Sequence, residues 1–167
     1  STVEVEQGFY KAYQYLKPTI HTQLASLRDQ YQTRQLLLTG HSLGAALATV
    51  MAYDTMDTYD IWLVTFGSPR VGNPAFVQAL QSLDVMYRVV HYYDIVPHTP
   101  EERLGYLHVP HEIWYDEANT HYVTCTDDAY HEDDACSNRC APTHCTSTSD
   151  HLNYMGIPMG SSSNGLC

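Results

Sequence analysis

A serine lies inside a short glycine-flanked segment, Gly40-His41-Ser42-Leu43-Gly44, between an apolar run and a stretch rich in Ala and Leu. The pattern G-x-S-x-G between a strand and a helix is typical of a nucleophile elbow, whose sharp turn lifts the serine hydroxyl clear of the sheet. We expect both glycines to remove side chains that would collide in the turn. The segment predicts Ser42 as a nucleophile, and the alternative is a glycine-rich turn with an incidental serine.

A serine hydroxyl needs an imidazole that accepts its proton and a carboxylate that orients the imidazole. After an elbow of this kind, the acid and then the base follow along the chain. Asp94 stands at the carboxyl end of a β-rich run over 86–93, which is where catalytic groups of open α/β sheets gather. We therefore predict Asp94 as the acid; an aspartate that only begins a turn before Pro97 is the alternative.

The base must be one of ten histidines, most of which have ordinary roles. Six lie at positions unsuited to a base, namely His21, His41, His91, His98, His108 and His111. Three belong to a cysteine-rich loop and are not dismissed by spacing alone, namely His121, His131 and His144. His151 precedes the short segment 152–156, which can hold an imidazole in position, so we predict His151 as the base.

The scaffold that must position these residues is an α/β domain. Its 167 residues, 44% of them hydrophobic, suffice to bury one core. Apolar and propensity patterns predict helices over 8–31, 43–56 and 74–83, and strands over 35–39, 61–66, 86–93 and 106–114. Such alternation predicts a mostly parallel sheet flanked by helices. We expect residues 1–167 to form a single domain.

Five segments, in the same order, make the chain similar to the fungal-type class 3 lipase family, which includes triacylglycerol lipases and feruloyl esterases. They are Gly8-Phe9, the elbow over 39–46, Thr65-Phe66-Gly67-Ser68-Pro69-Arg70-Val71-Gly72-Asn73, Asp94-Ile95-Val96-Pro97-His98, and Asp150-His151-Leu152-Asn153-Tyr154-Met155-Gly156. The resemblance implies an α/β-hydrolase fold, ester hydrolysis without a cofactor, and Ser42, Asp94 and His151 as nucleophile, acid and base.

The chain departs from this family at its front. Family members carry early strands, a lid helix and a loop that donates one oxyanion hydrogen bond ahead of the helix that begins near Gly8. The backbone N–H of Leu43 is expected to supply the other donor. We therefore expect a partial domain. Because losing one oxyanion donor commonly costs roughly a hundredfold to a thousandfold in rate, we expect full activity to require a further segment. That segment is expected in a longer precursor or in a companion chain.

Four of the five cysteines lie in the segment 125–145, and the fifth is Cys167. This density predicts an oxidising, secreted or lumenal location. Four clustered cysteines allow three pairings. Similarity to the family favours Cys125 with Cys136, which leaves Cys140 with Cys145, and it implies that Cys167 bonds to an N-terminal partner outside this sequence.

A zinc site is the alternative for this loop, with ligands drawn from Cys140, Cys145, His131 and His144. The cysteine spacing lacks a C-x-x-C pair, so no metal is predicted. The loop is also acidic, but it lacks the alternation and glycine of a calcium loop. We expect a solvated acidic loop; its acids are Asp127, Asp128, Glu132, Asp133 and Asp134.

The net charge of −11 arises from nineteen acidic against eight basic residues, which disfavours nucleic acid as a partner. An acidic surface also disfavours electrostatic attraction to anionic lipid, so we expect contact with lipid to be hydrophobic and transient. Ile95, Val96 and Leu152 neighbour the acid and base and are predicted to line the substrate site, whereas Arg70 and Asn73 are interpreted as turn and packing residues. We predict a triacylglycerol lipase-like serine ester hydrolase. The alternatives are a feruloyl or carbohydrate esterase and a non-catalytic lipase-like subunit of a larger assembly.

Overall fold

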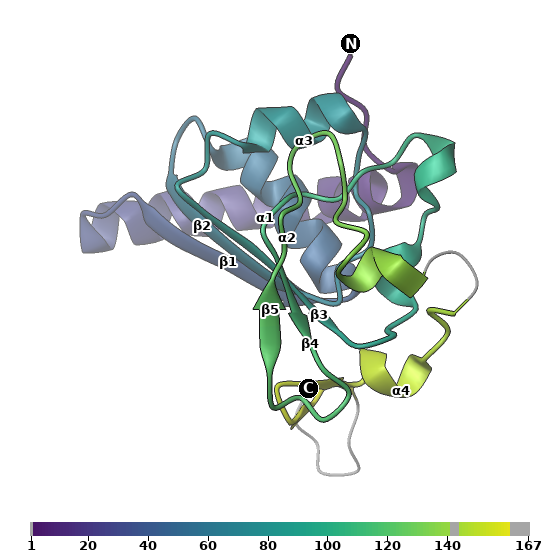
Figure 1. The fold of residues 1–167 in the computed structure, drawn as a ribbon. Helices are drawn as coiled ribbons and strands as arrows, with labels where there is room; N and C mark the ends of the chain where they lie inside the picture. Colours follow the sequence, from purple (N-terminus) through teal and green to yellow (C-terminus); the bar gives the residue numbers. More distant parts are fainter. Residues whose placement is uncertain (1, 141–143, 161–167) are drawn as a thin grey trace.

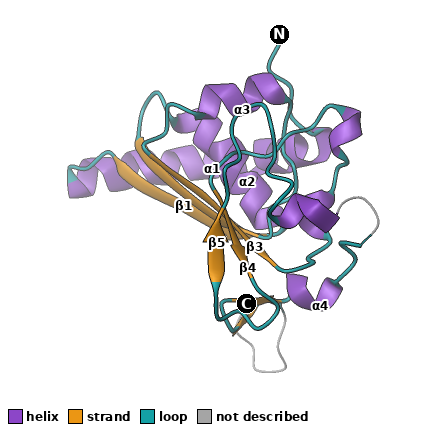
Figure 2. Ribbon diagram, in the orientation of Figure 1, coloured by secondary structure: helices purple, strands orange, loops and turns teal. Residues whose placement is uncertain are grey.

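A central five-stranded sheet organises the computed structural model, which describes residues 2–140 and 144–160. The strands are ordered β1-β2-β3-β4-β5, and β1 to β4 run parallel while β5 is antiparallel to β4 (Figures 1 and 2). Their bounds are β1 Gln35–His41, β2 Asp60–Phe66, β3 Val85–His91, β4 Glu112–Tyr115 and β5 Tyr122–Thr124. The mostly parallel α/β sheet expected from the sequence is confirmed.

Three helices cover one face of this sheet. They are α1 Gln7–Tyr31, α2 Leu43–Thr55 and α3 Pro74–Leu80. Side-chain N-caps stabilise the starts of α1 and α3. The Glu6 carboxylate accepts from the Phe9 N–H at 2.8 Å. Asn73, which directly precedes Pro74, accepts from the Phe76 N–H at 3.0 Å. Asn73 is thus a capping residue, in line with its interpretation as a turn residue.

The core lies between these helices and one face of the sheet. Tyr13 of α1, Val50 of α2 and Phe76 of α3 belong to one buried cluster with Leu38 and Leu63 of the strands. The helices lie together on this side of the strands in Figure 1. Because strand side chains alternate between faces, the neighbouring positions point the other way. On that face three large side chains are exposed, namely Leu37, Trp62 and Tyr87.

The strand expected over 106–114 is largely wrong. β4 begins only at Glu112, and in the stretch before it Leu107 makes one isolated bridge to Gly72. Pro110 lacks an N–H for a sheet ladder, and His111 has a φ of 69°, so extended backbone cannot continue through them. The antiparallel strand β5 is not among the strands expected from the sequence. It has only three residues, all of them exposed, which is too short a run to show an alternation of apolar and polar side chains.

Smaller elements complete the described part. Short 3₁₀ helices span η1 Val96–His98, η2 Glu102–Leu104 and η3 Ser137–Cys140. The helix α4 Thr148–His151 leads into a hairpin of β6 Asn153–Tyr154 and β7 Ile157–Pro158. Among the described residues, every helix is too short or too polar to cross a membrane.

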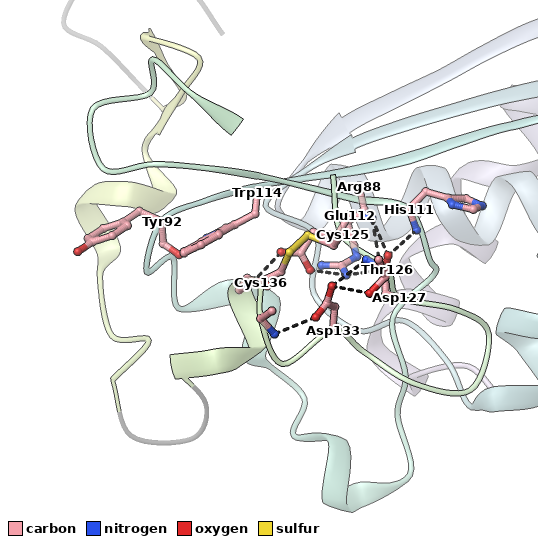
Figure 3. The surroundings of a disulfide bond; sticks show 12 residues. Arg88, Tyr92, His111, Glu112, Trp114, Cys125, Thr126, Asp127, Asp133 and Cys136 are labelled. Atoms are coloured by element: carbon pink, nitrogen blue, oxygen red, sulfur yellow. Dashed lines mark hydrogen bonds and ion pairs between the residues drawn. A yellow bond between two sulfur atoms is a disulfide. The ribbon is translucent and has the colours of Figure 1, made fainter. Parts of the chain in front are cut away.

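The acidic loop is not uniformly solvated, which corrects the expectation from composition. Asp127 and Glu132 are buried and pair with arginines of the sheet side. Arg88 Nη2 lies 2.8 Å from Glu112 and 3.2 Å from Asp127 (Figure 3). Arg70 Nη2 lies 2.6 Å from Glu132. Burial alone would raise the pKa of Glu132, but the nearby His108, the paired Arg70 and the charge of Arg88 together lower it to about 2. Buried ion pairs therefore fasten this loop to the core.

Two disulfides close the same loop, one between Cys125 and Cys136 and one between Cys140 and Cys145. Figure 3 shows the first beside Asp133, whose carboxylate accepts from the Thr126 N–H at 2.7 Å. Cys167 lies outside the described residues, so the bond expected for it stays a prediction.

Candidate active site

Ser42 occupies the tight turn between β1 and α2. Its φ of 57° and ψ of −125° are disfavoured for a residue with a side chain, and its N–H donates to the Phe66 carbonyl at 3.0 Å. A Cβ on Gly40 would lie 2.4 Å from the Gly44 carbonyl group, so only glycine fits there. A Cβ on Gly44 would meet no atom within 4 Å. The expectation that both glycines prevent a collision is therefore wrong for Gly44.

His151 connects Ser42 to Asp94. His151 Nε2 lies 2.8 Å from Ser42 Oγ, and His151 Nδ1 lies 2.8 Å from Asp94 Oδ2. The Asp94 side chain is 0% exposed and the imidazole of His151 is 14% exposed. Ser42 and His151 are 109 positions apart in the sequence, and Asp94 and His151 are 57 positions apart. The three side chains nevertheless form one continuous hydrogen-bonded path. With the proton of His151 assigned to Nδ1, Nε2 is free to accept the serine proton.

The parallel strands explain this convergence. Ser42 follows β1, Gly67 follows β2 and Asp94 follows shortly after β3, so all three lie at the carboxyl edge of the sheet. Gly67 has a φ of 54°, and a Cβ on it would stand 2.9 Å from Asp94 Oδ2 and 3.2 Å from His151 Cε1. A glycine is therefore required at this position to leave room for the acid and the base.

Two further groups hold the Asp94 carboxylate. The Val96 N–H donates to Oδ1 at 2.8 Å, and the Tyr154 hydroxyl donates to Oδ2. Burial, followed by the charge of Asp94, raises the pKa of Tyr154 well above its ordinary value, so this hydroxyl remains a donor. This role of Tyr154 is not predicted from the sequence, in which its only signal is its place three residues after His151.

His151 sits in a base-bearing segment, residues 147–155, that is tied to the rest of the fold. Ser147 exchanges backbone hydrogen bonds with Tyr93 and Ile95 on either side of Asp94, at 3.0 and 3.2 Å. His41 Nε2 lies 2.7 Å from the His151 carbonyl, and the two rings have centroids 4.4 Å apart. Burial lowers the pKa of His41, so no second cation lies beside the base near neutral pH.

The other residues predicted for the site lie as follows. The Leu43 side chain is exposed, and its N–H is the first after Ser42 at the start of α2. Ile95 and Val96 are half-buried beside Asp94, and Leu152 is exposed beside His151. Ile95 lines a cavity of about 780 Å³ together with His98 and Thr99. Val96 and Leu152 are not among the residues that line it.

Two groups of described residues have the composition of a metal site. One is Glu112 with Cys125 and Cys136, and the other is His98 with Cys140 and Cys145. In both groups the sulfur atoms are bonded to each other in disulfides, so neither offers a thiolate.

Comparison with known proteins identifies the family. The model of the Lipase (class 3) family matches residues 1–104. The chain belongs to the class 3 lipase family. This class 3 lipase chain is 36% identical to a lipase of Rhizomucor miehei in an alignment of 168 positions that covers 96% of the chain and 45% of that protein. It is 34% identical to a lipase of Rhizopus niveus over 95% of the chain and 41% of that protein.

Solved structures give the same result. The native Rhizomucor miehei lipase propeptide complex superposes with a TM-score of 0.84 at 35% identity, covering 96% of this chain and 53% of that one. A triacylglycerol lipase whose catalytic centre is formed by a serine protease triad gives a TM-score of 0.84 at 36% identity, covering 96% and 62%. The α/β-hydrolase fold predicted for the chain is confirmed. The chain spans about half the length of the curated relatives it matches.

Proposed function

We propose that this class 3 lipase chain carries the acyl-transfer centre of a serine ester hydrolase, with Ser42 as nucleophile, His151 as general base and Asp94 as the orienting acid. The observation that carries the proposal is the path Ser42 Oγ–His151 Nε2 and His151 Nδ1–Asp94 Oδ2, with both distances at 2.8 Å. A buried carboxylate that orients the imidazole and stabilises its charged form is the arrangement this chemistry requires.

The reaction follows from that geometry. Ser42 Oγ bonds to the ester carbonyl carbon while its proton passes to His151 Nε2, and the Leu43 N–H donates to the oxyanion. The ester C–O bond then breaks and His151 returns the proton to the leaving alkoxide, which departs as an alcohol. Water attacks the acyl-enzyme with His151 again as base, and collapse of the second intermediate releases the acid and restores Ser42.

The substrate class we propose is an acylglycerol. Relatives carry the names lipase and secreted mono- and diacylglycerol lipase, the latter from Fusarium solani at 39% identity over 67% of this chain. Ile95, Val96 and Leu152 are proposed as apolar lining because they adjoin the acid and the base. The net charge of −11 favours hydrophobic and transient contact with a lipid surface over electrostatic attraction to anionic lipid.

We further propose that additional residues, in a longer form of this chain or in a companion chain linked through Cys167, complete the site. In the described residues β1 pairs only with β2, and Leu37 and Trp62 beside this open edge are exposed. Such an edge is a template for further strands. These added residues would supply the second oxyanion donor. The two disulfides support a secreted or lumenal location.

Ester hydrolysis by the purified chain tests the proposal. Initial rates are measured on p-nitrophenyl esters of short and long acyl chains and on a feruloyl ester, with Ser42→Ala as the control. We expect turnover of the acyl esters that Ser42→Ala abolishes. A higher specificity constant for the feruloyl ester than for the acyl esters would favour the feruloyl esterase alternative. Equal rates of ester hydrolysis for the parent chain and Ser42→Ala would contradict the proposed function.

A further inference from the structure

His91 is a buried imidazole for which the reaction scheme has no use. It is the last residue of β3, three positions before Asp94. Its Nδ1 lies 3.0 Å from the carbonyl oxygen of Asp150, the residue immediately before His151. His91 therefore contacts the base-bearing segment directly, although the hydrogen bonds of its imidazole reach neither Ser42 nor Asp94.

The opposite side of the ring faces the turn between β4 and β5. His91 Nε2 lies 2.9 Å from the Asn119 side-chain nitrogen and 3.2 Å from the Glu117 carbonyl oxygen. The Asn119 side-chain oxygen accepts from the Met155 N–H at 2.9 Å, which turns its nitrogen toward His91. The turn between β4 and β5 thus contacts the base-bearing segment directly at Met155 and indirectly, through His91, at Asp150.

This turn has its own internal support. The Asp116 carboxylate accepts from the N–H groups of Thr120 at 2.8 Å and His121 at 3.2 Å. Asn119 has a φ of 57°, a left-handed conformation that asparagine adopts more readily than most residues. Contacts within the turn itself therefore hold the groups that contact His91 and Met155 in place.

The partners of His91 assign its proton to Nδ1 in the neutral ring. In this tautomer Nδ1–H donates to the Asp150 carbonyl and Nε2 accepts from the Asn119 amide. A doubly protonated ring would donate from Nδ1 to Asp150 and from Nε2 to the Glu117 carbonyl. The bond to Asp150 is present in both forms, so the contact with the base-bearing segment does not depend on the protonation state of His91.

We propose that His91 and Asn119 are positioning residues for the base: they hold the base-bearing segment on both sides of His151, so that Nε2 stays within hydrogen-bonding distance of Ser42 while Nδ1 stays on Asp94. The inference rests on the proposed function. Ser147 and His41 restrain the same segment from other sides, and His91 and Asn119 add contacts at Asp150 and Met155. A misplacement of about 1 Å in a reacting group can cost on the order of a hundredfold in rate. The β4–β5 hairpin then has a role in catalysis beyond extending the sheet.

Variants at two positions separate this role from general stability. His91→Leu removes the donor to Asp150, whereas His91→Asn retains an N–H donor at the δ position. Asn119→Leu removes the contact to Met155. His121→Asn is the control, because His121 lies on the same turn, is exposed, and makes its side-chain hydrogen bonds to Asp116 and Thr120.

The measurement is phosphonylation of Ser42 by a fluorophosphonate, resolved into the binding constant and the maximal rate. We expect His91→Leu and Asn119→Leu to lower the maximal rate by roughly tenfold to a hundredfold with the binding constant unchanged. His91→Asn should recover most of the loss, and His121→Asn should match the parent. Equal maximal rates for the parent and His91→Leu, or no recovery in His91→Asn, would overturn the proposal.

Amide hydrogen exchange supplies a readout that does not depend on catalysis. His91→Leu should speed exchange in residues 149–155 while α1 and α2 keep the exchange rates of the parent. Acceleration across the whole chain, or none in residues 149–155, would mean that His91 does not position the base. A parent protein that fails to react with the probe would count against the proposed function instead, and the exchange result would still decide the role of His91.

Discussion

The two glycines of the elbow are predicted to respond oppositely to the same substitution. Gly40→Ala would place a methyl group 2.4 Å from both the carbonyl carbon and the oxygen of Gly44, and 2.7 Å from the Ala45 nitrogen. All three are backbone atoms at the start of α2, so no side-chain rotation can relieve the contact. Gly44→Ala would place its methyl group in open space, with no atom within 4 Å.

The magnitudes follow from these contacts. Overpacking typically costs about 1–3 kcal/mol, and because backbone must move in Gly40→Ala we expect a loss at or above the upper end of that range. Gly44 is the second residue of α2, and alanine is favoured over glycine in a helix by up to about 1 kcal/mol, the full amount applying to the helix interior. Gly44→Ala is therefore expected to leave the free energy of unfolding unchanged or raise it.

Urea unfolding followed by far-UV circular dichroism measures both effects, and fluorophosphonate labelling reports whether the elbow survives. The midpoint should fall strongly for Gly40→Ala and should not fall for Gly44→Ala. Labelling of Ser42 should disappear in Gly40→Ala. Similar midpoints for the two variants would refute the contact argument, because the substitutions are chemically identical and differ only in the space around them.

Three further outcomes are expected from buried polar groups. Tyr154→Phe removes one donor to the triad carboxylate and should lower the free energy of unfolding by about 1.5–3 kcal/mol in urea titrations, while Ser42 still labels; an unchanged midpoint would contradict the hydrogen bond. Glu112→Gln leaves the buried Arg88 with less compensating charge and should cost about 3–5 kcal/mol in the same assay; a neutral effect would mean that the pair adds nothing. The pKa of Glu132 is about 2 in the folded chain against an ordinary 4.5, so its contribution to stability is present above pH 4.5 and is lost as the pH falls toward 2. Melting temperatures over this range should fall more steeply for the parent than for Glu132→Gln, and parallel curves would contradict the depressed pKa.

The sequence predicts those parts of the fold that depend on local patterns. The elbow, α1, α2 and the first three strands follow from apolar periodicity and the glycine–serine spacing, and the structure has them within a few residues of the expected ranges. The structure also brings Ser42, Asp94 and His151 together, although their catalytic roles remain predictions. Chain order and strand ends suffice for this because parallel strands place their carboxyl ends at one edge.

The other features of the fold and the site depend on contacts between residues far apart in the sequence. Such contacts leave no local pattern in the sequence from which they could be predicted. Composition alone assigned Glu132 to solvent, but Arg70, 62 positions away, pairs with it in the core. The roles of Tyr154 and His91 likewise depend on where the base-bearing segment docks. The stretch 106–114 resembles a strand in sequence because Leu107, Val109, Ile113 and Trp114 are apolar. A proline and the positive φ of His111 interrupt the extended backbone there.

The central claim is that Ser42 is an activated nucleophile, and covalent labelling tests it most directly. The native chain is treated with a fluorophosphonate and the modified residue is located by peptide mass spectrometry. We predict modification at Ser42 in the parent chain and its loss in His151→Ala, although Ser42 is intact in that variant. An unmodified Ser42 in folded protein, under conditions that label a control lipase, would contradict it.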